Sequence, residues 1–138
     1  MSGSDLVSSG VILLIVVTVA YGGTFLLRVG TGRVPANDLQ RTFFRAGHAH
    51  AGVLIILGLV VRLLLAQSDT VPAWSRMLGD GVLYAAILMP AGFFLSVVGR
   101  DPERPNGLRA LIWLGAASLT VGLVGAGLGL IQAGQAAS

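Results

Sequence analysis

The sequence of 138 residues contains no cysteine and no lysine, and only 11% of its residues are charged. The absence of cysteine excludes disulfides, thiolate metal sites and cysteine nucleophiles. Soluble domains carry about 25% charged residues, so this low proportion indicates a membrane protein. The length allows one domain, residues 1–138, and leaves no room for a separate soluble one.

Several functional classes lack the residues they would need. The positive charge comes from a few arginines in the connections between apolar segments, without interleaved aromatics, so it does not indicate nucleic-acid binding. No nucleophile elbow, phosphate loop or carboxylate pair supports a hydrolase or a kinase. An oligomeric transporter is disfavoured, because no intramembrane acidic residue and no inverted repeat is evident.

What the sequence does contain is hydrophobic runs, at residues 6–29, 46–66, 79–98 and 108–131. Each is close to the ~20 residues needed to cross the hydrocarbon core of a bilayer. Backbone polar groups in lipid must be satisfied within the segment, so the runs are expected to be helices. The expected fold is an all-α, integral membrane four-helix bundle.

The arginines predict the orientation of this bundle. Seven of the nine flank the first and third connections, and the positive-inside rule places both connections in the cytoplasm and both termini outside. The first segment does not resemble a signal peptide, because its leader carries Asp5 and no positive charge. We therefore expect a multi-pass protein of the bacterial inner (plasma) membrane. The seven arginines are Arg28, Arg33, Arg41, Arg45, Arg100, Arg104 and Arg109.

The two histidines of the chain, His48 and His50, open the second segment. Ionisable groups at the edge of a bilayer core are costly and usually face protein, water or a cofactor. Residues two apart on a helix do not face each other, so the pair should serve different faces. His50 shares its face with apolar residues and Gly47, which suits a flat hydrophobic cofactor such as haem, with His50 as the metal ligand. The alternative is that both histidines are hydrogen-bonded interfacial residues.

Other residues around this block are candidates for binding the cofactor. Arg45 and His48 share a more polar face and are suited to a haem propionate or a substrate carboxylate, while Gly52 leaves room beside the ligand. The alternative for Arg45 is an interaction with lipid phosphate.

Aromatic residues at a similar depth suggest a pocket beside His50. We expect Tyr21, Phe94 and Trp113 to be the catalytic candidates, with Thr24 also lining the pocket. The alternative is that the aromatics belong to the interfacial belt of the membrane.

Two further patterns have structural interpretations. Arg62 lies deep in the second segment, and an ion pair with Asp69 or Asp80 would neutralise it. Small residues recur along one stripe of the fourth segment, which allows close packing within the chain or between subunits. The stripe is Gly115, Ser118, Gly122, Gly125 and Gly129.

The layout resembles that of small four-helix membrane proteins of the styrene oxide isomerase and hydroxylaminobenzene mutase type. The topology matches over nearly the whole chain. The motif match covers two short stretches, Arg45-Ala46-Gly47-His48-Ala49-His50-Ala51-Gly52 and Gly92-Phe93-Phe94-Leu95.

This resemblance implies a ferric haem b ligated by His50 at a subunit interface of a homo-oligomer, with a trimer suggested. It also implies that the iron acts as a Lewis acid on the oxygen of a small hydrophobic epoxide. Two positions depart from the family: Ile56 or a neighbour stands in place of an asparagine, and Phe94 in place of a tyrosine. The competing function is a non-enzymatic accessory subunit of a larger respiratory or transport complex, which predicts no cofactor.

Overall fold

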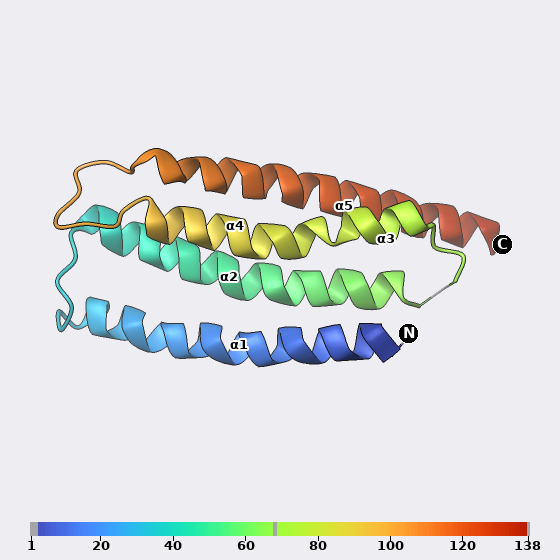
Figure 1. The fold of residues 1–138 in the computed structure, drawn as a ribbon, viewed down its shortest axis with the longest axis horizontal. Helices are drawn as coiled ribbons and strands as arrows, with labels where there is room; N and C mark the ends of the chain where they lie inside the picture. Colours follow the sequence, from blue (N-terminus) through green and yellow to red (C-terminus); the bar gives the residue numbers. More distant parts are fainter. Residues whose placement is uncertain (1–2, 68, 138) are drawn as a thin grey trace.

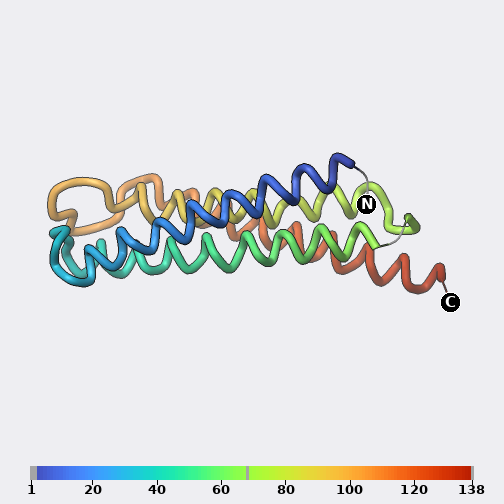
Figure 2. The backbone as a smooth tube through the Cα atoms, turned by 90° about the horizontal axis from the view of Figure 1, so that it is seen from below, coloured from blue at the N-terminus to red at the C-terminus, as the bar shows by residue number. Residues whose placement is uncertain are grey.

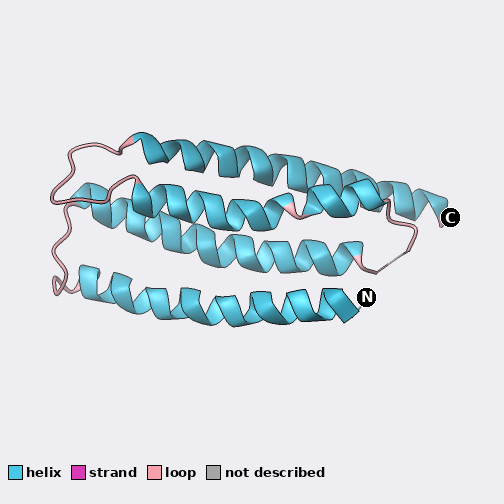
Figure 3. Cartoon of the chain, viewed as in Figure 1, coloured by secondary structure: helices cyan, strands magenta, loops and turns pink. Residues whose placement is uncertain are grey.

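The computed structural model describes residues 3–67 and 69–137. Within these residues the chain is helical and contains no strand (Figures 1 and 3). Four helical segments of the described chain are long and apolar enough to cross a membrane, with α3 and α4 together forming the third. The expected all-helical fold is therefore confirmed, and the four segments support the expected multi-pass membrane protein. The elements are α1 (Gly3–Gly30), α2 (Asp38–Leu65), α3 (Ala73–Gly79), α4 (Gly81–Leu95), η1 (Gly107–Arg109) and α5 (Ala110–Ala136).

The helices run side by side, with α1 at one edge, α2 and α3–α4 in the middle and α5 at the other edge (Figures 1 and 2). The connection from α1 to α2 and the connection from α4 to α5 lie at one end of the molecule, and both chain ends lie at the other (Figure 1). The two connections that most of the arginines occupy or flank therefore share one end, as the sequence predicted.

Helix α2 begins at Asp38, well before the expected start near residue 46. Its N-terminus is closed by a capping box, in which the Gln40 amide donates to Asn37 Oδ1 at 2.9 Å and the Asn37 amide donates to Gln40 Oε1 at 3.2 Å. A capping box satisfies backbone donors that would otherwise have no partner. The two histidines consequently lie several turns inside the helix rather than at its first turn.

The same two residues also connect the ends of α2 and α4. Asn37 Nδ2 donates to Asp101 Oδ1 at 2.8 Å and to the Pro102 carbonyl at 2.9 Å. Gln40 Nε2 donates to the carbonyls of Val97 and Gly99, each at 3.1 Å. The two connections at this end are thus held together by side-chain hydrogen bonds.

The third segment differs from the expected 79–98. It begins at Ala73, after Pro72, and is interrupted at Asp80, between Gly79 and Gly81. It ends as a helix at Leu95, although the following Ser96 and Val97 remain buried. The start of this segment was predicted too late because its first two turns contain the polar residues Ser75 and Arg76, which lower the local hydropathy.

The stripe of small residues on α5 packs against α3 and α4. A Cβ at Gly122 would lie 2.8 Å from the Val82 nitrogen, and one at Gly125 would lie 2.6 Å from Leu78 Cβ. Ser118 Oγ donates to the Gly81 carbonyl at 2.8 Å. Small residues permit this close approach, which serves packing within the chain.

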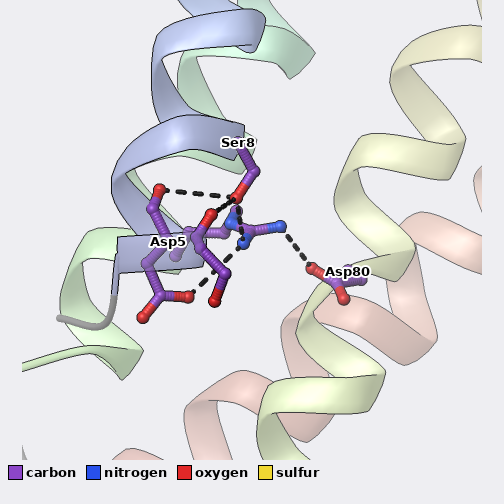
Figure 4. A network of polar contacts seen from close by, with 5 residues as sticks. Asp5, Ser8 and Asp80 are labelled. Carbon is purple, nitrogen blue, oxygen red and sulfur yellow. Dashed lines mark hydrogen bonds and ion pairs between the residues drawn. The ribbon is translucent and has the colours of Figure 1, made fainter.

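Helix α1 is peripheral. Val29 is its one buried residue among those described, and Ile12, Val16 and Val19 pack against the core while remaining partly exposed. A polar cluster fastens its N-terminal end to the bundle (Figure 4): Arg62 lies 3.2 Å from Asp80, 3.7 Å from Asp5 and 3.1 Å from Ser8 Oγ. The predicted Arg62–Asp80 ion pair is confirmed. Asp5 was not foreseen as a partner, and the alternative partner Asp69 is exposed in the connection after α2.

Candidate functional site

The two histidines of α2 serve different neighbours, as their spacing predicted. His48 faces α1, where Cβ atoms built on Gly22 and Gly23 would lie 3.7 Å from its Nδ1 and 3.6 Å from its Nε2. His50 lies against Phe93 of α4, with ring centroids 5.0 Å apart. The histidines therefore mark two separate sites.

At His50, one hydrogen bond sets the orientation of the ring. Nδ1 lies 2.7 Å from the carbonyl oxygen of Ala46, one turn earlier in α2. Because a carbonyl can only accept, Nδ1 carries the proton, and in the neutral imidazole Nε2 keeps its lone pair. Histidines that bind metals usually donate their second N–H to such a carbonyl or to a carboxylate. The contact thus orients the His50 ring, and the neutral tautomer that it favours is the one in which Nε2 can bind a metal.

Phenylalanines from three helices surround this part of α2. Phe94 stacks on Phe44 with centroids 5.6 Å apart, and Phe44 meets Phe25 of α1 edge-on at 5.3 Å. Gly47 makes room for this arrangement, since a Cβ there would lie 2.8 Å from the Phe94 ring. Phe43 packs edge-on against Phe93 at 5.6 Å, on the side of His50.

A cleft of about 370 Å³ opens between α1 and α2 beside His48. Its lining is mostly apolar, with the imidazole of His48 and the hydroxyl of Thr18 as its polar groups. The Gly22–Gly23 pair, which brings α1 close to His48, was missed in the sequence although it stands in an otherwise bulky apolar helix. The lining residues are Thr18, Val19, Gly22, Phe25, His48, Ala51 and Phe94.

The predicted pocket of His50, Tyr21, Thr24, Phe94 and Trp113 does not form within a single chain. Phe94 lines the cleft beside His48 instead. Tyr21 and Trp113 are 78% and 75% exposed. Gly22 and Gly23 turn toward α2, so the adjacent Tyr21 turns outward, and Thr24 is exposed with its hydroxyl donating to the Tyr21 carbonyl.

The remaining candidates are accessible on the surface of the bundle. Arg45 is exposed, and Gly52 has open space where a Cβ would stand. Trp113 borders a broad cleft of about 800 Å³ at the start of α5, together with Phe43 and Arg109. These residues are free to contact lipid, a cofactor or another subunit.

Across residues 3–67 and 69–137 no three histidine, aspartate or glutamate side chains converge on a point where a metal ion would sit. The arrangement instead offers single imidazoles with apolar surroundings. Comparison with protein-family models, with curated proteins and with solved structures gives no match, so the function of the two histidine sites rests on their own geometry.

Proposed function

We propose that this chain is a membrane protein that binds haem b through Nε2 of His50. The observation that carries the proposal is the bond between His50 Nδ1 and the Ala46 carbonyl, which leaves Nε2 free to ligate iron. Porphyrin supplies four nitrogen ligands of its own, so one oriented imidazole is sufficient on the protein side.

The surroundings of His50 fit a porphyrin in part. Phe93 and Phe43 give the ring an apolar side, and the exposed guanidinium of Arg45 is available for a propionate. A porphyrin reaching beyond these residues needs a second covering surface. We therefore propose a homo-oligomer with haem between subunits, and the trimer implied by the family resemblance is the state to test first.

The reaction proposed from that resemblance is the isomerisation of a small hydrophobic epoxide dissolved in the bilayer. Bound ferric haem would supply a Lewis acid for the epoxide oxygen. The chain itself orients the His50 ring through the Ala46 carbonyl. At the two departing positions it offers hydrocarbon instead of a polar partner: Ile56 is exposed, and Phe94 packs across Gly47.

The orientation proposed for the protein places the end with the two arginine-bearing connections in the cytoplasm of a bacterium. Its support is the positive-inside rule applied to the shared end seen in Figure 1.

The deciding experiment compares His50→Ala with His48→Ala. Both variants are purified in the same detergent from cells supplied with haem, and the ratio of haem to protein is measured from the Soret band. We expect wild-type protein and His48→Ala to retain haem and His50→Ala to lose it. Loss in His48→Ala alone would reverse the assignment, and a haem-free wild-type protein would refute the cofactor.

The second candidate is an accessory subunit of a larger membrane complex. It is favoured by the outer face of α1, where large apolar side chains such as Leu14 and Val17 are exposed. It predicts haem-free protein that co-purifies with larger partners.

A further inference from the structure

The cleft beside His48 has the features of a ligand site separate from His50. It lies on the α1 side of α2, whereas His50 lies against Phe93 of α4. Its volume of about 370 Å³ falls within the range typical of small-molecule pockets, roughly 300–1,000 Å³. Because most of its lining is hydrocarbon, a ligand would be apolar over most of its surface.

The imidazole of His48 is the unusual group in this lining. In the described part of the chain its ring nitrogens have no hydrogen-bond partner. They are not fully buried, and the imidazole lines the cleft. Polar groups in apolar surroundings cost free energy unless they are paired. A neutral imidazole offers one donor and one acceptor, so a hydroxyl group complements it.

Thr18, on the opposite wall, adds a second acceptor. Its hydroxyl hydrogen is already used, because Oγ1 donates to the Ile15 carbonyl at 2.7 Å. The lone pairs of Oγ1 remain to accept a hydrogen bond. The aromatic rings of Phe25 and Phe94 line the same cleft and favour a flat aromatic ligand.

We propose that the α1–α2 cleft binds a small phenol or aromatic alcohol from the bilayer. The hydroxyl of the ligand pairs with the His48 imidazole, and its ring lies among Phe25 and Phe94. Gly22 allows this, since a larger side chain at that position would extend into the cleft next to His48. This site does not depend on haem binding at His50.

The test uses 4-fluorophenol as the ligand and fluorobenzene, which lacks the hydroxyl, as its matched analogue. Binding to the purified protein in detergent is followed by ¹⁹F NMR line broadening. We expect wild-type protein to bind the phenol about tenfold more tightly than fluorobenzene, the effect of one net hydrogen bond. Equal binding of the two compounds would overturn the proposal.

Three variants locate the binding. Gly22→Leu should fill the cleft and abolish saturable binding of both compounds, whereas Gly10→Leu, in open space on the same helix, should bind as wild type does. His48→Phe replaces the imidazole by an apolar ring. The ratio of the affinity for 4-fluorophenol to that for fluorobenzene should then fall close to one. If Gly22→Leu fails to fold, the preference measured in His48→Phe still decides, and a preserved tenfold preference there refutes the role of His48.

Discussion

Replacing Gly122 by alanine tests the close contact between α5 and the third membrane segment. The added Cβ would lie 2.8 Å from the Val82 nitrogen and 3.1 Å from the Gly81 carbonyl carbon. Both are backbone atoms of the facing segment, so a rotamer change cannot relieve the overlap and the helices must separate. Overpacking costs about 1–3 kcal/mol. We expect a loss of about 2–3 kcal/mol, which lowers the folded-to-unfolded ratio about 30- to 150-fold.

The control is Gly127→Ala on the same helix, where nothing lies within 4 Å of the new Cβ. Stability is measured by reversible unfolding in mixed detergent micelles, with tryptophan fluorescence as the signal. Gly127→Ala should be neutral or slightly stabilising, because alanine favours a helix more than glycine does. Equal midpoints for the two variants would show that the α5 stripe does not pack as described.

Three further predictions concern the two ends of the bundle. Arg62→Ala should lose about 1.5–3 kcal/mol in the same unfolding assay, the value of hydrogen bonds to charged groups, and an equal effect of the exposed loop variant Arg33→Ala would contradict this. Asn37→Ala should lose about 1–2 kcal/mol, because it removes a helix cap and the contact to the second connection; an unchanged midpoint would count against that role. In the cysteine-free chain, Arg33→Cys should resist an impermeant thiol reagent in intact cells while Asp69→Cys is labelled, and the reverse pattern would invert the proposed orientation.

The membrane segments were predictable because hydrocarbon length selects runs of about 20 apolar residues. The residues at which these helices begin and end were harder to predict. Hydropathy marks where apolar surface begins, whereas α2 begins where Asn37 and Gln40 cap its backbone, two turns earlier. The Asn-x-x-Gln spacing was visible in the sequence and is the signal that would have located this start.

The candidate site was predictable only where it depends on a single helix. Helical spacing separates His48 from His50 whatever surrounds them. The cleft, in contrast, depends on the rotation of α1 about its own axis. Because the apolar residues of α1 are spread around the whole helix, hydropathy does not indicate which side meets α2. The adjacent glycines at 22 and 23 mark that side, and Tyr21 faces away as a result.

The hydrogen bonds of Gln40 have a consequence for how the protein is assembled during synthesis. Gln40 is 8% exposed as a residue, and the carbonyls that accept from its side-chain nitrogen, those of Val97 and Gly99, lie 57 and 59 residues further along the chain. When α1 and α2 have first entered the bilayer, Gln40 Oε1 can already accept from the Asn37 amide, but Gln40 Nε2 has neither of its two carbonyl partners. Those carbonyls follow α4 directly, so α2 and the third segment are expected to become a single cooperative unit only after the connection following α4 has been made.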